Sequence, residues 1–349
     1  MQRRIPSFFV ATAPRLMWAA IALAGCGSEE APTPPLWQQV YARLPGALLS
    51  VWGTASNDVW AVGTAPGPGE APTVLHYDGS TFEALDAGEP GDLWWAFGFE
   101  SGPVYLGGSG GLILRYEAGV FTRLATPGTG TVFGIWGSSP DNVWAVGGEA
   151  GGSRGAFAWR LTGDSWQAAA GFPSALADTG ALWKVFGRGS SDVWMVGTGG
   201  KTLHWDGAQL AEGFIGIAES LFTVHANSEV FATVGGFASG LLLERPTGDA
   251  SAAWQDRSPA DSTALIGVCL TETSGYAVGQ FGYVATRGPS GWTEELTGFE
   301  ADVGARSLHS VWIDPDQGVW AAGGQVIAPP LTDGVLLHRG ASLPAGAAE

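Results

Sequence analysis

The sequence predicts an all-β protein assembled from repeats, and three observations support this prediction. A stretch that begins at Leu48, LLSVWGTASNDVWAVG, returns as VFGIWGSSPDNVWAVG from Val132, LWKVFGRGSSDVWMVG from Leu182 and LHSVWIDPDQGVWAAG from Leu308. The apolar segments are short, rich in valine and aromatic residues, and bounded by Gly, Asn, Asp or Ser, which is typical of antiparallel strands joined by tight turns. No segment has sustained helical periodicity. We therefore expect the chain of 349 residues to form one repeat architecture.

The spacing of the repeat predicts a closed ring of seven units. The aromatic position of the first copy has a counterpart in each later copy, and the series is Trp52, Phe97, Trp136, Phe186, His225, Cys269 and Trp312. Successive positions are 39 to 50 residues apart, with a mean of about 43, which is the period of a four-stranded propeller blade. A solenoid would need atypical polar caps at both ends, and none is visible. We predict a seven-bladed β-propeller of antiparallel blades over residues 36–349.

The first unit shows how each blade divides into strands. Its first strand ends in the Val-Trp-Gly element, and the next strands are expected at 59–62, 74–77 and 81–85. The seventh unit has its third strand at 335–339 but then runs into SLPAGAAE, without an aromatic fourth strand. The early segment 36–40, LWQQV, resembles the missing piece. We predict that this N-terminal strand completes the last blade and closes the ring, which also removes an unpaired strand edge.

Residues 1–25 form a separate segment. Three arginines precede a short apolar run, LMWAAIAL, which is shorter than the ~20 residues needed to span a bilayer. The next four residues, Leu23-Ala24-Gly25-Cys26, resemble the lipobox of bacterial lipoproteins. The resemblance implies a signal peptide over 1–25, cleavage before Cys26 and lipid on its thiol, which with further acylation anchors a protein stably. The alternative is a chance LAGC in an ordinary exported protein. Residues 26–35 are then a lipidated, proline-rich tether.

The residues around the lipobox also indicate an export route and a destination. Gly27 and Ser28 are not the aspartate that marks inner-membrane retention, so the resemblance favours the outer membrane of a bacterial cell envelope. Pro6 and Ser7 stand where the twin-arginine motif needs apolar residues, so general secretion is expected.

Charge and cysteine content narrow the partners. The chain has 16 Lys plus Arg against 33 Asp plus Glu, a formal net charge of −17. Cleavage would remove three arginines and no acid, leaving 13 bases against 33 acids, or about −20. Such a body repels nucleic acid and anionic lipid head groups, whereas cations, basic proteins and neutral glycans remain possible ligands. If Cys26 carries lipid, Cys269 has no partner, and no disulfide framework is expected.

The repeats resemble known propeller families. V-W-A-V-G-G followed by a strand, Y-D-G and an aromatic strand is similar to kelch-type repeats, and WGSSPDNVWAVG at 136–147 resembles repeats of bacterial surface lipoproteins. The resemblance implies a propeller but no chemistry, since propellers host many functions. The boxes typical of sialidase propellers and quinone-dependent dehydrogenases are absent. Galactose oxidase resembles kelch proteins and uses copper with a cross-linked cysteine and tyrosine. Here Cys269 and Tyr276 hold core positions of one blade, which favours packing.

Most residues that suggest a ligand site also have a packing explanation. Most of the 17 tryptophans recur at fixed strand positions, where burial between sheets accounts for them. Trp94, Trp95 and Trp183 do not, and they lie where the first strands of blades two and four begin. His225 and His309 could approach the central channel, although a hydrogen-bonded structural histidine is the simpler interpretation.

No sequence motif requires a cofactor. The acidic turn 56–58 and its copies at 141–142 and 191–192 could bind Ca²⁺ through oxygen ligands. Asx and Ser residues also cap tight turns without an ion, and this alternative is favoured. No histidine spacing supports zinc.

Connection lengths give the best indication of a working surface. The turns after strands one and three of each blade are short, whereas the connections after strands two and four vary, as at 64–73, 86–92, 167–180, 211–220, 297–306 and 325–334. Variable loops on one end of a rigid ring are typical of a binding surface, although loops also diverge without function. The candidate ligand-binding residues on this end are Asp92, Trp94, Asp178, Lys184, Glu212, Asp261, Asp302 and Asp333.

Two functions remain open. The favoured hypothesis is a lipid-anchored binding or scaffold module that presents its acidic loops to a protein or glycan of the envelope. The alternative is a hydrolase or lyase acting on extracellular polysaccharide, with two carboxylates of the same end as acid and base.

Overall fold

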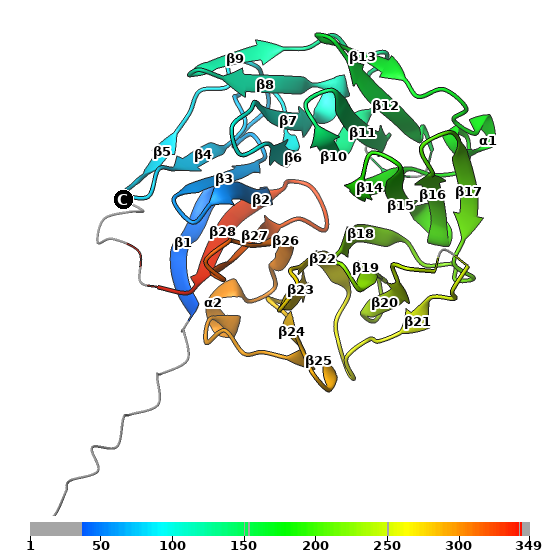
Figure 1. Cartoon of the computed structure of the whole chain (residues 1–349). Helices are drawn as coiled ribbons and strands as arrows, with labels where there is room; N and C mark the ends of the chain where they lie inside the picture. The colour runs from blue at the N-terminus through cyan, green and yellow to red at the C-terminus, as the bar shows by residue number, and fades with distance from the viewer. Residues whose placement is uncertain (1–36, 150, 153, 250, 342, 344–349) are drawn as a thin grey trace, which may run out of the picture. The chain divides into compact units, whose positions relative to one another are not determined.

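The computed structural model describes residues 37–149, 151–152, 154–249, 251–341 and 343. These residues form seven four-stranded antiparallel sheets arranged as a ring (Figure 1). The prediction of an all-β, seven-bladed propeller is therefore confirmed. The predicted signal peptide, the tether and Cys26 lie outside the described residues.

Six blades take their four strands from consecutive segments of the chain. Blades one to three are β2 (Leu48–Ala55), β3 (Asp58–Gly63), β4 (Val74–Tyr77) and β5 (Phe82–Ala84); β6 (Leu93–Gly98), β7 (Val104–Gly108), β8 (Ile113–Glu117) and β9 (Val120–Arg123); and β10 (Thr131–Ser139), β11 (Asn142–Gly148), β12 (Phe157–Thr162) and β13 (Ser165–Ala168). Blades four to six are β14 (Leu182–Gly189), β15 (Asp192–Gly197), β16 (Lys201–Trp205) and β17 (Leu210–Phe214); β18 (Leu221–Ala226), β19 (Val230–Gly235), β20 (Leu241–Pro246) and β21 (Gln255–Asp256); and β22 (Leu265–Leu270), β23 (Gly275–Gly279), β24 (Val284–Gly288) and β25 (Gly291–Glu294).

The seventh blade joins the two ends of the chain. Its sheet has the order β1-β28-β27-β26, formed by β1 (Trp37–Gly46), β26 (Ser307–Ile313), β27 (Val319–Gln325) and β28 (Thr332–Arg339). Trp37 pairs with Arg339 and Gly46 with Thr332, so the predicted closure by the N-terminal strand is confirmed. The strand is longer than the predicted 36–40 and contains two register irregularities. Only Ala47 separates β1 from β2, so one continuous chain links blade seven to blade one.

Packing between neighbouring blades explains the repeated Val-Trp-Gly element. A Cβ on Gly98 would lie 2.9 Å from the Cη2 of Trp52, and one on Gly53 would lie 2.8 Å from that of Trp312. Trp136 makes the same approach to Gly187, at 2.5 Å. Each of these tryptophans therefore lies on the glycine that follows the equivalent position in the next blade. Only glycine leaves room for the ring, because interiors are close-packed.

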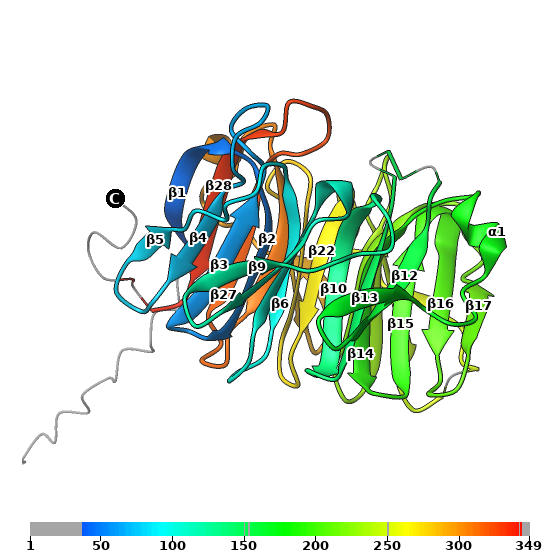
Figure 2. The same ribbon diagram turned by 90° about the horizontal axis from the view of Figure 1, so that it is seen from above.

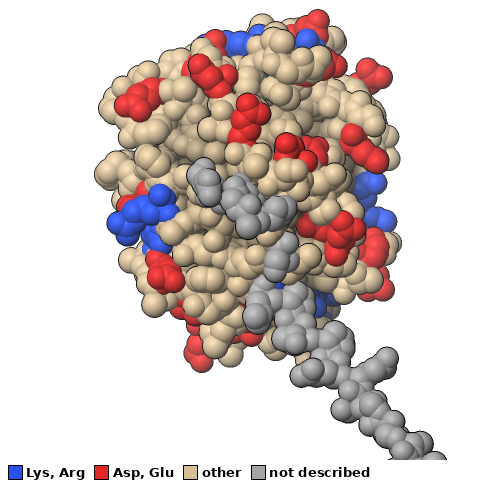
Figure 3. All heavy atoms as spheres, turned by 90° about the vertical axis from the view of Figure 1, so that its left-hand side faces the viewer, with Lys and Arg blue, Asp and Glu red and all other residues tan. Residues whose placement is uncertain are grey.

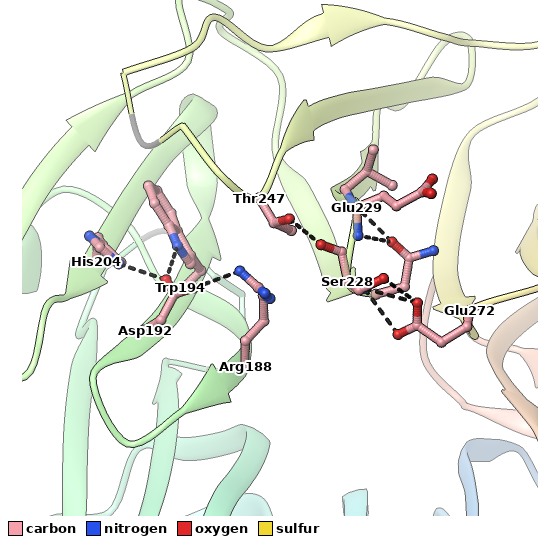
Figure 4. A network of polar contacts seen from close by, with 10 residues as sticks. Arg188, Asp192, Trp194, His204, Ser228, Glu229, Thr247 and Glu272 are labelled. Carbon is pink, nitrogen blue, oxygen red and sulfur yellow. Dashed lines mark hydrogen bonds and ion pairs between the residues drawn. The ribbon is translucent and has the colours of Figure 1, made fainter.

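Polar groups at one end of blades one and four form the same internal network. Asp192 Oδ1 accepts hydrogen bonds from Trp194 Nε1 at 3.0 Å and from His204 Nε2 at 2.9 Å, and the two rings stack at 4.2 Å (Figure 4). Asp58 makes the same bonds in blade one, at 3.2 Å and 2.7 Å. Trp320 donates to Asp314 in blade seven, and its ring lies tilted at 4.2 Å from that of His338. The shared histidine position of the repeat is therefore a packing position.

Two short α-helices of the described residues lie in connections between blades. They are α1 (Ser174–Ala177) and α2 (Glu300–Val303). Within the part of the chain that the structure describes, neither these nor any other helix has the length and apolar character needed to cross a bilayer.

Candidate binding face

The two ends of the ring differ in the length of their connections. We call the end formed by the connections after strands two and four of each blade the loop face, and the opposite end the turn face. On the loop face the connections range from Ala47 alone to 169–181, and those between β3 and β4 and between β27 and β28 project from the same end of the blades (Figure 2). The turn face has short turns except at 247–254 of blade five. The predicted asymmetry is thus present.

The predicted acidic residues are spread over this face. Asp92, Asp178, Asp261, Asp302 and Asp333 belong to connections or strand ends of different blades. Asp92 Oδ1 accepts a hydrogen bond from Ala65 N at 3.1 Å, and Asp333 pairs with Arg43 at 3.2 Å. On the flank drawn in Figure 3, Asp and Glu side chains likewise stand as separate groups among uncharged residues. These five predicted acids belong to separate segments and provide a dispersed negative charge.

Glu212 does not lie in a loop, so the predicted connection 211–220 is wrong at its start. The residue is part of β17 and pairs with Leu203 at the outer edge of blade four. Strand pairing continues to Phe214 because the neighbouring strand β16 offers partners along its whole length. Glu212 is exposed on the rim of the ring.

Lys184 is buried inside the ring. Its Nζ donates to the Phe133 carbonyl at 2.8 Å and lies 4.4 Å from the centre of the Trp95 ring. No carboxylate among the described residues forms an ion pair with it. Burial lowers the pKa of Lys184 to about 7.

Lys184 borders a cavity of about 190 Å³ on the ring axis, to which all seven innermost strands contribute. The cavity lining is largely apolar and includes His225 and Cys269. Burial lowers the pKa of His225 to about 4 and raises the pKa of the Cys269 thiol to about 12. His225 Nδ1 accepts a hydrogen bond from Leu270 N at 3.2 Å. At neutral pH the cavity therefore holds a neutral imidazole and an unreactive thiol.

Each innermost strand carries a β-bulge at its loop-face end. The register slips around the residue that follows the first apolar residue of each repeat, and the residues at this position are Leu49, Trp94, Phe133, Trp183, Phe222, Ile266 and His309. A bulge adds one unpaired residue and redirects its side chain. Because the bulge recurs in every blade, these large side chains gather around the axis.

Five of these residues form an aromatic collar: Trp94, Phe133, Trp183, Phe222 and His309. Ring centres are 5.1 Å apart for Trp94 and Phe133, 4.6 Å for Phe133 and Trp183, and 5.9 Å for Trp183 and Phe222. His309 lies 6.0 Å from Trp94. The indole N–H groups of Trp94 and Trp183 are buried and have no hydrogen-bond partner among the described residues.

The sequence indicated only part of the collar. Trp94, Trp183 and His309 could be singled out, whereas Phe133 and Phe222 read as ordinary strand residues. The missed signal is positional, because each collar residue follows the first apolar residue of its repeat. His309 is a neutral structural group, since burial and the charge of Lys184 lower its pKa to about 3 and its Nδ1 bonds the Leu49 carbonyl at 2.6 Å.

Exposed apolar side chains are concentrated around the collar's end of the ring. Phe237 is 66% exposed and its ring lies 5.2 Å from that of Phe222. Phe281, Leu296 and Ile327 are also exposed on loop-face connections. Of the large apolar residues exposed in the described part, only Val120 and Phe214 lie elsewhere, on outermost strands. Apolar surface on this face is typical of an interaction site.

The possible metal ligands of the described residues do not gather at one point. Within the described ranges, no group of three or more His, Cys, Asp or Glu side chains is arranged to hold a metal ion. In the acidic turn of blade one, Asp58 accepts hydrogen bonds from Thr54, Trp60 and His76. The carboxylate proposed for Ca²⁺ is thus already engaged.

Comparison with known proteins supports the fold and identifies no family. No protein-family model and no curated protein matches the chain. Among solved structures it is similar to YCF48 bound to D1 peptide (TM-score 0.63, 14% identity, 89% of this chain and 100% of that one) and to the WD40 propeller of Doa1 (0.60, 9%, 87% and 96%). The extracellular domain of BT4673 from B. thetaiotaomicron is also similar, with a TM-score of 0.63 and 11% identity. The match covers 88% of this chain and 40% of that one. These likenesses establish a β-propeller.

Proposed function

We propose that this protein is a lipid-anchored binding module of a bacterial envelope, which holds a protein partner on its loop face. The observation that carries the proposal is the collar with its unpaired indole N–H groups, surrounded by exposed apolar residues and dispersed acids. Protein interfaces combine an aromatic centre with a polar rim, and Trp residues dominate their binding energy.

Charge selects the kind of partner. A chain with a formal net charge of −17 attracts basic surfaces and speeds their association. The solved structure of YCF48 with D1 peptide supplies a similar propeller in a peptide complex. A basic protein segment is therefore favoured over a neutral glycan as the ligand.

Hydrolysis has weaker support than binding. A general acid needs a carboxyl group with a raised pKa facing a second carboxylate. In the described part, every carboxyl group with a resolved shift has a lowered pKa, because hydrogen bonds stabilise the ionised form. The candidate acids also belong to different blades.

The membrane part of the proposal rests on Cys26 in its Leu-Ala-Gly-Cys context. Replacement Cys26→Ser removes the thiol that would accept lipid. Metabolic labelling with a fatty-acid analogue should disappear in this variant and persist in Cys269→Ser. Labelling of Cys26→Ser would refute the anchor.

The binding face is tested by capture from envelope extracts. We expect Asp92→Lys, Asp178→Lys and Asp302→Lys together to abolish capture of the partner. A matched control reverses three exposed acids away from the loop face, Glu83, Glu100 and Asp141. Equal capture by both triple variants would contradict the proposal.

A further inference from the structure

Blade six carries a small, separate cavity on the loop face. It has a volume of about 230 Å³ and lies where the connections 257–264 and 280–283 meet the end of β25 and the segment 295–300. Sites for whole small molecules usually measure about 300 to 1,000 Å³. The size therefore suits one side chain of a larger ligand.

Two of the four carboxylates that line this cavity are already engaged. Glu295 accepts hydrogen bonds from Trp37 Nε1 at 2.8 Å and from Arg339 Nε at 2.6 Å. Glu300 accepts from the backbone N–H groups of Thr297 and Gly298, at 2.6 and 3.1 Å. These two acids hold the walls of the cavity together.

The other two carboxylates are free to meet a ligand. Asp261 and Glu294 are exposed, and neither forms a hydrogen bond or ion pair with its side chain in the described part of the chain. Their negative charges are not neutralised by the protein itself. A cation would complete this side of the cavity.

An unpaired polar group of a residue that lines the cavity is a second, independent sign of a ligand. Tyr283 is only 8% exposed, and its hydroxyl has no hydrogen-bond partner among the described residues. Burial, followed by the charges of Glu294 and Asp261, raises its pKa, so the group stays protonated. An unpaired buried hydroxyl costs about 1 to 3 kcal/mol. A ligand N–H would remove this cost.

An exposed phenylalanine borders the same cavity in an unfavourable backbone conformation. Phe281 has φ 59° and is 56% exposed. The equivalent residues in the turns of blades two and four are Gly110 and Gly199, with φ 68° and 65°. A left-handed conformation costs a residue other than glycine about 1 to 2 kcal/mol. The turn therefore carries the aromatic ring of Phe281 at a position where glycine would be more stable.

We propose that this cavity binds the side chain of a lysine or arginine from the protein that the loop face holds. This inference rests on the proposed function. Asp261 and Glu294 neutralise the cationic head, the Tyr283 hydroxyl accepts one of its N–H groups, and the Phe281 ring covers the stem or meets the cation through its face. An apolar stem with a cationic end fits all four groups.

The test uses n-butylammonium and n-propylguanidinium as probes, with n-butanol as the neutral control. Amide chemical shifts of residues 280–283 in the full chain should change saturably with either cation and not with butanol. The variant Asp261→Asn with Glu294→Gln should weaken binding at least tenfold. The control Glu70→Gln with Glu219→Gln removes two exposed loop-face acids elsewhere and should leave binding unchanged.

Two further variants separate binding from folding. Tyr283→Phe and Phe281→Gly should each weaken cation binding several-fold while leaving the thermal midpoint equal or higher, because one removes an unpaired hydroxyl and the other a strained φ. A lower midpoint with unchanged binding would show that both residues are structural and would overturn the inference.

The remaining outcomes separate this inference from the proposed function. Equal binding by both acid pairs, or CaCl₂ occupying the site in preference to the organic cations, would overturn the side-chain assignment. Capture of a partner through the loop face would still support the proposed function in either case. Cation binding at 280–283 without any captured partner would support the cation subsite and contradict the proposed function.

Discussion

The turn-face networks of blades one and four and the loop face treat their polar groups differently. On the turn face, Asp58 and Asp192 each engage a tryptophan and a histidine of their own blade. On the loop face, the indole N–H of Trp94 and the hydroxyl of Tyr283 have no partner in the described part, and Glu294 has no ion pair there. Paired groups stabilise a fold, whereas unpaired ones cost stability and are retained where a ligand uses them.

Charge on the axis follows the same division. Lys184, which is buried, and His309, which is half-buried, lie near the loop-face end of the innermost strands without a carboxylate partner in the described residues. Isolated buried charges shift their pKa toward the neutral form. We therefore expect the turn face to stabilise the ring and the loop-face end to lower its stability.

The largest expected effect is a loss of stability in acid through His309. Its pKa is about 3 in the folded protein against 6.5 in an unfolded chain. Between these values the unfolded chain binds a proton that the folded one excludes, so stability is complete above pH 6.5 and falls as the pH drops toward 3. Between pH 7 and 4.5 the free energy of unfolding of His309→Gln, measured in urea, should fall by about 2 to 3 kcal/mol less than that of the parent protein. The same pH dependence of the unfolding free energy in the parent and the variant would contradict a neutral His309 imidazole.

A turn-face carboxylate should matter more to folding than a loop-face one. Asp58→Ala removes the acceptor of Thr54, Trp60 and His76 and should cost about 2 kcal/mol of unfolding free energy. Glu294→Ala removes an unpaired loop-face side chain from a strand and should change stability by less than about 0.5 kcal/mol. Denaturant midpoints of the two variants measure the difference. Similar losses of stability in both variants would contradict the claim that the two faces differ.

Replacing Lys184 should stabilise the protein. Lys184→Met keeps the apolar stem and removes a buried charge, so we expect a gain of about 1 to 2 kcal/mol at pH 7. The folded pKa of about 7 lies below the unfolded 10.5, so the cost of the ammonium is full below pH 7 and vanishes as the pH rises to 10.5. The gain should therefore shrink toward pH 10. A destabilised Met variant at pH 7 would assign Lys184 a net stabilising role.

The smallest expected effect restores a turn-face network in blade three. Asn142 stands where blades one and four have aspartate; it accepts from Arg160 at 2.7 Å, and the Trp144 indole N–H is unpaired among the described residues. Asn142→Asp should add a charged acceptor for both groups and stabilise by about 0.5 to 1 kcal/mol. Thermal unfolding at low and high salt checks this, since part of the gain should be lost on screening.

The sequence predicted the ring because the repeat is local and periodic. Trp52 and its counterparts set the blade number, and the absent fourth strand after Arg339 identified the N-terminal strand as its replacement. Such inferences need only spacing within the chain. The bounds of β17, and hence the position of Glu212, were missed because an exposed outer strand has little apolar alternation.

The candidate site depended on contacts between segments that are distant in sequence. The Phe133 carbonyl that holds Lys184 comes from the preceding blade, and the bulges that form the collar depend on strand register. The blade-six cavity combines three connections around Tyr283. One signal was present, since Gln280-Phe281-Gly282 occupies the position of Ser-Gly-Gly and Thr-Gly-Gly in blades two and four.

The central claim, that partners meet the loop face, is tested most directly by site-specific photo-crosslinking in the native cell. A photoreactive phenylalanine replaces Phe237 on the loop face or Glu100 on the turn face, both of which are exposed. We predict a discrete crosslinked partner from position 237 and none from position 100. A partner captured from position 100 alone would contradict the account.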